Sequence, residues 1–283
     1  MIVVSTVSDL RREIQNVRRA SKRVGFVPTM GNLHAGHLKL IDVVRERADF
    51  TVASIYVNPL QFGPQEDFAS YPRTPEEDRQ ALTEAGADLL FMPTTEEMYP
   101  RGMHAQTVVE VPELSNILCG AFRPGHFRGV TTVVNHLFNL THPDVAVFGK
   151  KDYQQLLLIR LMVSDLGMPI DIVGVDTLRE RDGLALSSRN RYLRPDEREL
   201  APALHAVLRE AQGKLMRGGA VFPAIEASAA EQLRKAGFRP DYVSIVRQQD
   251  LGKPSAEDRR LAVLAAAWLG RTRLIDNVEV EIP

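Results

Sequence analysis

The sequence predicts an α/β fold in which a parallel sheet wound with helices is followed by a smaller α+β unit. Over the first two thirds of the chain, short apolar runs alternate with longer segments of helical periodicity, as in a parallel sheet covered by helices. After about residue 177 this alternation stops, and Ala, Glu, Arg and Leu dominate. The length of 283 residues accommodates one large domain together with a smaller one.

The expected strands of the first domain are short apolar runs, most of which end at Gly, Pro or Asn. They cover residues 24–28, 50–57, 89–92, 145–148 and 170–175. Thr74 marks the start of one helix, because Pro75 follows at the first helical position and Glu77 lies three residues later. Helices are expected over residues 36–48, 74–86, 130–140 and 152–166.

The second domain is expected to be a small α+β unit. Residues 196–236 predict two helices broken around Gly218-Gly219. The boundary is expected near residue 176, which gives domains over residues 1–176 and 177–283. Three strands are expected over residues 241–246, 260–267 and 272–280.

Composition and charge limit the classes of function. The 35 basic and 36 acidic residues nearly cancel, so no overall positive field attracts nucleic acid, and no nucleic-acid partner is expected. No stretch has the apolar length of a membrane span, and the N-terminus lacks the order of a secretory signal, so no membrane partner and a cytoplasmic location are expected. The single cysteine, Cys119, excludes an internal disulfide, and a small buried side chain is favoured there over a nucleophile.

The segment from Pro28 to His37 carries the strongest chemical signal. It joins a predicted strand to a predicted helix, a junction that lies at the ligand-binding edge of a doubly wound sheet. Gly31 permits a tight turn, and Gly36 lets a ligand approach the N–H groups and positive dipole end of the helix. His34 and His37 can donate hydrogen bonds to phosphate oxygens and stabilise the charge that develops as pyrophosphate leaves. Two alternatives remain open: a metal-binding pair, for which no further ligands are obvious, and two structural histidines.

Two further segments follow predicted strands and supply polar side chains. Asn58 and Gln61 offer neutral amides that suit a substrate with hydroxyl groups and a carboxylate, although Asn-Pro is also a routine strand terminator. Lys151 can reach a phosphate as a compact charge, and Gln155, one helical turn later, can face the same cleft. An ordinary turn and a solvated lysine are the respective alternatives.

The segment 183–190 contains two hydroxyl side chains followed by a cation. Ser187, Ser188 and Arg189 suit a phosphate clamp, because the guanidinium offers a planar fork of donors. A Ser-Ser-Arg run is also common in ordinary turns. The position just after the expected domain boundary favours a clamp that closes over a nucleotide.

The segment RPGHFRGV, from Arg123 to Val130, places Arg and His between glycines. A mobile cationic flap, a contact to a carboxylate, and a solvated loop before the helix over residues 130–140 are all compatible with it. No chemical role is assigned to this segment. Two common enzyme motifs are absent from the sequence: there is no GxSxG nucleophile elbow and no GxxxxGK[ST] phosphate loop.

Taken together, these segments resemble the pantothenate synthetase (pantoate–β-alanine ligase) family. The resemblance rests on FVPTMGNLHAGHLKL, IYVNPLQFGPQEDFASYPRT, FRPGHFRGVTTVV, FGKKDYQQL and DGLALSSRNRYL, in that order, and on AAWLGRTRLIDN near the end of the chain. The first segment is shared more broadly by the HxGH nucleotidyltransferase superfamily, relatives of class I aminoacyl-tRNA synthetases. In such enzymes SSRN would play the part of a mobile KMSKS-like loop.

The resemblance implies a Rossmann-type N-terminal domain that carries the active site and a C-terminal domain that acts as a lid. It implies an ATP-dependent enzyme that condenses (R)-pantoate with β-alanine in two steps. Pantoate carboxylate attacks the α-phosphate of ATP to give pantoyl adenylate and pyrophosphate, and the amine of β-alanine then gives pantothenate and AMP. The resemblance also implies Mg²⁺ accompanying ATP as co-substrate, no organic prosthetic group, and a homodimer.

The same resemblance implies catalytic roles for His37, His34, Lys151 and Arg189. His37 carries the family's label of proton donor, but stabilisation of the leaving pyrophosphate is physically preferred, because attack by a carboxylate needs no base. The implied ATP-binding residues are Met30, Gly31, Asn32, Leu33, His34, Ala35, Gly36, His37, Gly149, Lys150, Lys151, Asp152, Leu178, Leu186, Ser187, Ser188 and Arg189.

Gln61, Gln155 and Asn58 are the expected contacts of pantoate or β-alanine, and Asp78 or Glu77 is expected near Mg²⁺. Small departures from the family pattern are Asn32, where alanine is common, and Lys150, where glutamate is frequent.

Two other classes of function remain open. One is an HxGH enzyme that transfers a nucleotidyl group to a phosphate ester, against which the amides of VNPLQF and KKDYQQ count. The other is a non-catalytic nucleotide-binding protein on the same fold. The intact residues His34, His37, Lys151, Ser188 and Arg189 argue against that second alternative.

Overall fold

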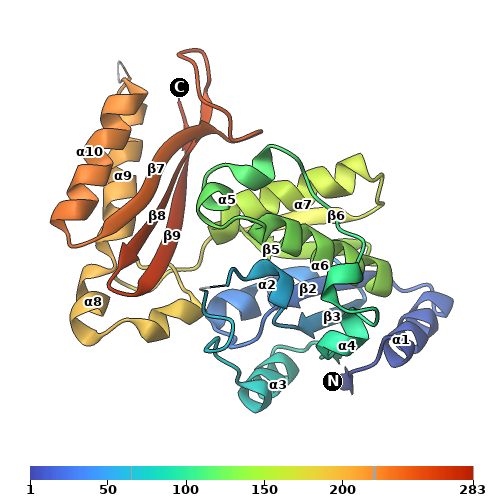
Figure 1. Ribbon diagram of the computed structural model, residues 1–283. Coiled ribbons are helices and arrows are strands. Elements are labelled where there is room, and N and C mark those ends of the chain that lie inside the picture. Colours follow the sequence, from blue (N-terminus) through green and yellow to red (C-terminus); the bar gives the residue numbers. More distant parts are fainter. Residues whose placement is uncertain (65, 219–220, 283) are drawn as a thin grey trace. The chain divides into compact units, whose positions relative to one another are not determined.

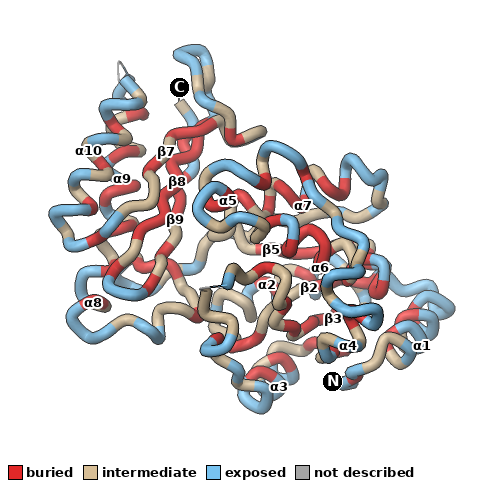
Figure 2. Tube along the Cα trace, in the orientation of Figure 1, coloured by how far each residue is buried: buried red, intermediate tan, exposed pale blue. Residues whose placement is uncertain are grey.

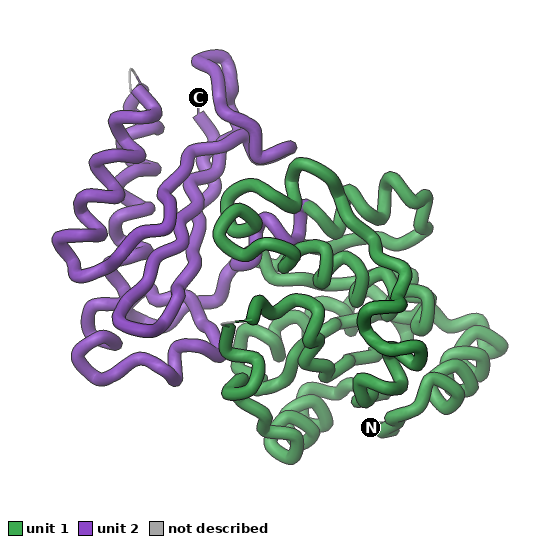
Figure 3. The backbone as a smooth tube through the Cα atoms, in the orientation of Figure 1, with its two compact units in different colours: residues 1–150, 158–176 green, residues 151–157, 177–283 purple. Residues whose placement is uncertain are grey.

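The structure is a computed structural model, and it describes residues 1–64, 66–218 and 221–282. The chain forms two compact units, one of residues 1–150 and 158–176 and the other of residues 151–157 and 177–283 (Figure 3). Residues 151–157 therefore cluster with the second unit although the first unit resumes after them.

The first unit is built on a six-stranded sheet in which every neighbouring pair is parallel (Figure 1). The spatial order is β1-β4-β3-β2-β5-β6. The strand order reverses between β2 and β5, and in such open sheets ligands bind beside the carboxyl ends of the strands at this switch point. The strands are β1 (Ile2–Val4), β2 (Val24–Thr29), β3 (Phe50–Ile55), β4 (Leu89–Phe91), β5 (Val145–Gly149) and β6 (Asp171–Val175).

Helices and short 3₁₀ turns connect these strands. Helix α2 contacts β2, β3 and β5, while α1 contacts α6, which also contacts β2. The helices are α1 (Val7–Arg19), α2 (Ala35–Arg45), α3 (Pro75–Glu84), α4 (Thr95–Met98), α5 (Cys119–Phe122), α6 (His126–Thr141) and α7 (Tyr153–Asp165). The 3₁₀ turns are η1 (Pro59–Gln61), η2 (Met103–Ala105), η3 (Leu114–Asn116) and η4 (Lys150–Asp152). Within the described ranges, no helix combines the length and the apolar character needed to cross a membrane.

Local sequence explains how the helices meet the sheet. In α1, Leu10, Ile14 and Val17 recur at helical spacing and are buried, whereas the residues between them are mostly exposed. Gly25 on β2 allows the close approach of α2, because a side-chain carbon there would lie 2.4 Å from a methyl group of Val44. Buried residues follow the strands of the sheet and the inner faces of its helices (Figure 2).

The second unit is an antiparallel three-stranded sheet with helices packed on it. The strand order is β7-β8-β9, and α9 contacts β8 and β9 while α10 contacts β7. Its core combines apolar residues of α9, α10 and all three strands. The elements are η5 (Ser188–Tyr192), α8 (Pro195–Leu200), α9 (Ala203–Met216), α10 (Phe222–Lys235), β7 (Arg239–Arg247), β8 (Arg260–Leu269) and β9 (Thr272–Glu281).

The expected fold class is confirmed, and several boundaries differ. Helix α6 begins at His126 rather than near residue 130, so the second part of RPGHFRGV is helix and Phe127 is buried. Strand β1 was not predicted, because three residues give too short a pattern. The charged amphipathic run that follows it forms α1, although it was not assigned to a helix. The helix break expected around Gly218-Gly219 lies partly outside the described residues.

Candidate active site

The turn between β2 and α2 places two histidines at the carboxyl edge of the sheet, beside the switch point. Gly31 and Asn32 adopt positive φ angles of 79° and 50°, which reverse the chain sharply before the helix. His34 is the N-cap of α2, and its Nδ1 accepts a hydrogen bond from the N–H of Gly36 (3.1 Å). The N–H of His34 in turn points to Nδ1 of His37 (3.4 Å), and the two ring centroids are 4.1 Å apart.

This reciprocal capping determines which ring nitrogen carries the proton. Nδ1 of both His34 and His37 accepts from a backbone N–H, so the proton of each neutral imidazole is on Nε2. Each ring can therefore donate a hydrogen bond from Nε2 at the positive end of the α2 dipole. Such an arrangement is suited to the oxygens of a phosphate group.

Asp78, expected near Mg²⁺, supports the turn that precedes the histidines. It lies on α3, is 3% exposed, and accepts hydrogen bonds from the N–H groups of Asn32 (2.8 Å) and Leu33 (2.7 Å). Its carboxylate holds the left-handed turn that precedes the histidines. Glu77, the alternative candidate, is exposed.

The expected proximity of Asp78 or Glu77 to Mg²⁺ stays a prediction. Mg²⁺ takes oxygen ligands in octahedral geometry and is usually bound by one or two carboxylates together with waters and substrate phosphates. Both oxygens of Asp78 already accept a backbone N–H in the interior. In the part of the chain that the structure describes, no group of three or more His, Cys, Asp or Glu side chains is arranged to hold a metal ion. The interpretation of the His34–His37 pair as a metal site gains no support either.

A cluster of amides follows β3. Gln61 is 8% exposed, and its Nε2 lies 2.9 Å from Sδ of Met30. Asn58 is fully buried and donates through Nδ2 to the carbonyl of Gly129 (3.1 Å), while its Oδ1 accepts from the hydroxyl of Tyr99 (2.9 Å). Burial raises the pKa of Tyr99, so its hydroxyl stays protonated and keeps donating. Asn58 therefore acts as an anchor of the turn, and Gln61 is the better candidate for a substrate contact.

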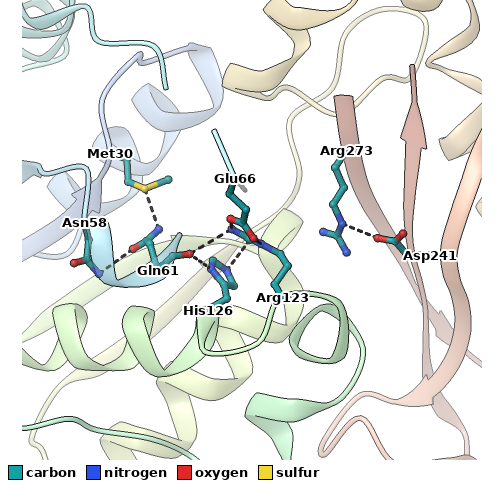
Figure 4. A network of polar contacts seen from close by, with 8 residues as sticks. All are labelled: Met30, Asn58, Gln61, Glu66, Arg123, His126, Asp241 and Arg273. Atoms are coloured by element: carbon teal, nitrogen blue, oxygen red, sulfur yellow. Dashed lines mark hydrogen bonds and ion pairs between the residues drawn. The ribbon is translucent and has the colours of Figure 1, made fainter. Parts of the chain in front are cut away.

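The segment RPGHFRGV lies against this same turn (Figure 4). Arg123 forms a two-pronged ion pair with Glu66, and His126 Nδ1 lies 2.8 Å from the carbonyl oxygen of Gln61. A side-chain carbon at Gly129 would lie 2.3 Å from the carbonyl oxygen of Leu60, so α6 and η1 pack backbone against backbone.

Strand β5 ends at Gly149, on the other side of the switch point from β2. A side-chain carbon at Gly149 would meet no atom within 4 Å, so the backbone there is open to a ligand. Lys150 pairs with Asp176 (2.8 Å). The carbonyl of Lys151 accepts a hydrogen bond from Nδ2 of Asn277 on β9 (2.9 Å).

Polar residues continue from this turn into α7. The ammonium of Lys151 lies 3.8 Å from the carboxylate of Asp152. Gln155, in the first turn of α7, is partly exposed, whereas its neighbour Gln154 is buried. These positions keep Lys151, Asp152 and Gln155 among the candidates for ligand contacts.

The expected clamp lies in a loop of the second unit. Ser187 is the N-cap of η5, and its Oγ accepts a hydrogen bond from the N–H of Arg189 (3.3 Å). Ser188 is 9% exposed, and Leu186 is partly buried. Leu178, at the other end of the loop, is 41% exposed.

Strand β9 anchors that loop through residues that sequence reasoning did not single out. Asp276 receives both arms of the Arg179 guanidinium (2.7 and 2.9 Å), and Nδ1 of His205 lies 3.4 Å from the same carboxylate. Burial alone would raise the pKa of Asp276, but contacts from His205 and Arg179 outweigh it and hold the pKa below its usual value. Because the adjacent Asn277 binds the carbonyl of Lys151, β9 holds both segments in the second unit.

The expected site residues thus fall into two groups. Within the first unit, Met30–His37, Asn58, Gln61 and Gly149–Lys150 lie at the carboxyl ends of β2, β3 and β5. Within the second unit, β9 binds Lys151 through Asn277 and the 178–189 loop through Asp276 and Arg179. Asp152 and Gln155 belong to the same unit. The roles of Asp78, Tyr99 and Asp276 were missed because their partners lie far away in sequence, and no local pattern marks them.

Fold and site together define a class of protein. Paired histidines cap the helix after an interior strand of a doubly wound sheet, at its switch point, as expected for an HxGH-type nucleotide-binding enzyme. A family model described as pantoate-beta-alanine ligase matches residues 2–279. The protein belongs to the pantoate–β-alanine ligase family, which confirms the resemblance drawn from its motifs.

Relatives and solved structures agree with this assignment. The chain is 56% identical over 282 residues to pantothenate synthetase of Pseudomonas putida, covering 100% of this chain and 98% of the relative, and 55% identical to that of Azotobacter vinelandii, covering 100% of both. The crystal structure of pantothenate synthetase from Thermus thermophilus matches with a TM-score of 0.93 and 49% identity over 100% of both chains. Pantoate-beta-alanine ligase from Francisella tularensis, complexed with beta-gamma ATP and beta-alanine, matches with a TM-score of 0.83 and 33% identity, covering 98% and 97% of the two chains.

Proposed function

We propose that this protein uses ATP to join pantoate to β-alanine through a pantoyl-adenylate intermediate. The observation that carries the proposal is the pair His34 and His37, whose capping puts the ring protons on Nε2 at the N-terminus of α2 beside the switch point. The Francisella tularensis relative, complexed with beta-gamma ATP and beta-alanine, supports the choice of substrates.

In the first step, a carboxylate oxygen of pantoate attacks the α-phosphorus of ATP, and the bond from that phosphorus to the bridging oxygen of pyrophosphate breaks. Negative charge accumulates on the leaving pyrophosphate. His34 and His37 stabilise that charge through Nε2–H donors, and the α2 dipole adds to their effect. Lys151, Ser188 and Arg189 supply further donors to the phosphates, the guanidinium through its planar fork.

Mg²⁺ enters this scheme as part of the ATP substrate. Asp78 and Glu77 remain the carboxylates proposed to lie near the ion, and neither is singled out as its ligand. The backbone at Gly149 and the residues Met30–His37, Lys150, Asp152, Leu178 and Leu186–Ser187 complete the proposed nucleotide contacts. Their expected effect is on the affinity for ATP.

Pantoate is held by amides in this proposal. Gln61 and Gln155 bind its hydroxyl groups and carboxylate, and Asn58 fixes the turn that presents Gln61. Neutral amides suit a carboxylate that must act as a nucleophile, since a full cation on it would withdraw the electron density that attacks phosphorus. In the second step, the neutral amine of β-alanine attacks the acyl carbon, AMP leaves, and the amine loses a proton.

The experiment that tests the proposal separates the two steps. Purified protein is incubated with Mg-ATP and pantoate and then with β-alanine, and pyrophosphate, AMP and pantothenate are measured separately. Pyrophosphate that requires pantoate, followed by AMP and pantothenate on addition of β-alanine, is the expected result. Pyrophosphate formed only with a phosphate-ester acceptor would favour a nucleotidyltransferase, and no pyrophosphate with any acceptor would favour a binding protein.

Two substitutions at His37 test the role of Nε2. Glutamine can place its amide nitrogen near the position of Nε2, whereas asparagine reaches only the position of Nδ1 and preserves the cap. We therefore expect His37→Gln to keep more pyrophosphate-forming activity than His37→Asn. The loss in His37→Asn should be about 10²-fold or more, as for removal of one transition-state donor. Equal activity of the two variants would contradict the role of Nε2.

The remaining expectations belong to the same proposal. Residues 1–176 form the catalytic domain and residues 177–283 its lid, the protein acts as a homodimer, and it works in the cytoplasm. Light scattering on the purified protein tests the dimer: the 31.6 kDa chain should give a particle of twice that mass. A monomer at working concentration would contradict it.

A further inference from the structure

Arg123 is a cation with polar partners on two sides, and it lies beside the turn that carries Gln61. Its Nε and Nη2 bind the two carboxylate oxygens of Glu66 at 2.8 and 2.5 Å, and its Nη1 lies 2.9 Å from Nε2 of His126. Nδ1 of His126 faces the carbonyl of Gln61 at 2.8 Å and must carry the ring proton, which leaves Nε2 to accept from Arg123. The guanidinium side chain is only 15% exposed.

The backbone packing of α6 against η1 determines where Arg123 lies. Arg123 lies just before α6, whose N-cap is Gly125, and α6 abuts η1 at Gly129. Nη2 of Arg123 also lies 3.5 Å from the carbonyl of Gln61. Arg123 is therefore positioned relative to Gln61 by contacts on two sides of the guanidinium (Figure 4).

The geometry of the ion pair identifies the kind of ligand that this cation prefers. A guanidinium that binds both oxygens of one carboxylate through Nε and Nη2 is in the fork-to-fork arrangement typical of carboxylate recognition. Glu66 comes from the irregular segment after η1, where its N–H donates to the carbonyl of Gly63 (3.0 Å) in a backbone turn. One carboxylate can replace another on the fork without changing the charge that is paired with the guanidinium.

The two substrates of the proposed reaction place different demands on a cation. The carboxylate of pantoate is the nucleophile, and a guanidinium on it would slow its attack. The carboxylate of β-alanine takes no part in bond formation and survives in the product, so a strong ion pair with it does not hinder the chemistry. Met30, Asn58 and Gln61 supply only neutral atoms near this point.

We propose that Arg123 binds the carboxylate of β-alanine and that Glu66 occupies the same guanidinium fork until β-alanine displaces it. Glu66 is then an internal competitor of the second substrate, and Arg123 selects an amine that carries a carboxylate. This inference rests on the proposed ligase function and extends it to the recognition of the amine substrate.

The test compares Arg123→Gln and Glu66→Gln in the complete reaction and in the first step alone. For Arg123→Gln we expect the KM for β-alanine to rise at least tenfold, far more than any change in the KM for pantoate or in pantoate-dependent pyrophosphate release. For Glu66→Gln we expect the KM for β-alanine to fall severalfold, because the competitor is weakened. A purely structural ion pair would make both substitutions harmful.

A neutral analogue of β-alanine allows the amine preference to be measured, and damage to the fold does not change that preference. The amide of β-alanine has the same amine but no carboxylate, so wild-type protein should strongly prefer β-alanine to the amide. Arg123→Gln should lose most of this preference, whereas a misfolded variant would lose activity toward both amines equally. Arg18→Gln serves as a control, since Arg18 forms an ion pair with Asp144 (2.7 Å) outside the site and its loss should leave the preference unchanged.

Other outcomes would overturn the inference. An unchanged KM for β-alanine in Arg123→Gln, an unchanged amine preference, or a raised KM for β-alanine in Glu66→Gln each contradicts it. A raised KM for pantoate with loss of the first step would assign the guanidinium to pantoate instead. Failure of wild-type protein to release pyrophosphate with pantoate would reject the ligase function itself, which is a separate result.

Discussion

Asp78 shows how one buried side chain shapes a site that it does not enter. Its two carboxylate oxygens accept the N–H groups of Asn32 and Leu33, and those groups belong to the turn that leads to His34. A carboxylate is suited to this position because it is acceptor-only, and both partners are donors. Gly31 fits the same corner tightly, since a side-chain carbon there would lie 2.9 Å from Asp78.

The variant Asp78→Asn should lower both stability and the rate of the first step. Its amide would point an N–H donor at a backbone N–H in the interior, which costs about 1–3 kcal/mol. Pyrophosphate release and urea unfolding measure the two effects. The loss of rate should not be rescued by excess Mg²⁺, because the displaced turn does not depend on the Mg²⁺ concentration.

Asp144→Asn is the matched control for this prediction. Asp144 also accepts a backbone N–H, that of Val24 (2.6 Å), but at the opposite end of β2 from the histidines. It should lose stability with the rate of the first step nearly intact. Rescue of Asp78→Asn by Mg²⁺ would instead support the interpretation of Asp78 as a metal ligand.

At the scale of elements, the contact of α6 with η1 determines where Gln61 lies. The variant Gly129→Ala would place a methyl group 2.3 Å from the carbonyl oxygen of Leu60 and 2.7 Å from the N–H nitrogen of Gln61. We expect a loss of about 1–3 kcal/mol from overpacking and a raised KM for pantoate, because the turn must shift. Urea unfolding and steady-state kinetics measure these changes.

Gly213→Ala provides the control for Gly129→Ala. Gly213 lies inside α9, and a side-chain carbon there would meet only the flexible Arg217 at 3.6 Å. This substitution should stabilise the protein by about 0.5–1 kcal/mol, because alanine favours helix. If Gly129→Ala were equally harmless, the close contact of α6 and η1 would not control Gln61.

Strand β9 also gives a prediction, which concerns acid stability. The folded pKa of Asp276 lies below its ordinary value of 3.8, so its ionised form stabilises the native state. This contribution is complete above pH 3.8 and is lost as the pH falls from there through the lower folded pKa. Removal of one partner of such a buried pair costs about 3–5 kcal/mol at neutral pH.

We therefore expect Asp276→Asn to be less stable than wild type at neutral pH and the difference to shrink below pH 3.8. Urea unfolding at several pH values between neutral and acidic measures it. Asp196→Asn is the control, since Asp196 is an exposed carboxylate that pairs with Arg194 (3.0 Å) and should show almost no effect. A difference that stayed constant with pH would contradict the assignment to Asp276.

At the scale of the whole molecule, the proposed ATP contacts are drawn from both compact units. Met30–His37 belong to the first unit, and Lys151 and the 186–189 segment belong to the second. A non-hydrolysable ATP analogue at about a hundred times its Kd should stabilise the folded protein by about 2.7 kcal/mol. Hydrogen exchange should slow in both groups of residues.

The same measurement tests the proposed lid. Lys151→Ala should weaken the protection of the 186–189 segment more than that of the histidine loop, because Lys151 belongs to the second unit. Protection restricted to the first unit would contradict a role of residues 177–283 in closing over ATP.

The sequence alone determined much of this protein. The alternation of strands and helices, the motif at the end of β2 and the family follow from patterns that span a few residues, such as apolar spacing, glycine positions and paired histidines. These patterns act through local backbone preferences, so they are visible before the chain is folded. The short strand β1 and the true start of α6 were not predicted from the sequence, because their local patterns are weak.

Only the tertiary structure decided which distant residues support the site. Asp78 reaches back 46 residues to Asn32, Arg123 lies 57 residues from Glu66, and Arg179 lies 97 residues from Asp276. Such pairs form because the order of strands and the packing of helices bring them together, and nothing near them in sequence announces the partner. For this reason the support that Asp78 gives to the turn could not be predicted, and RPGHFRGV had no role until its neighbours were known.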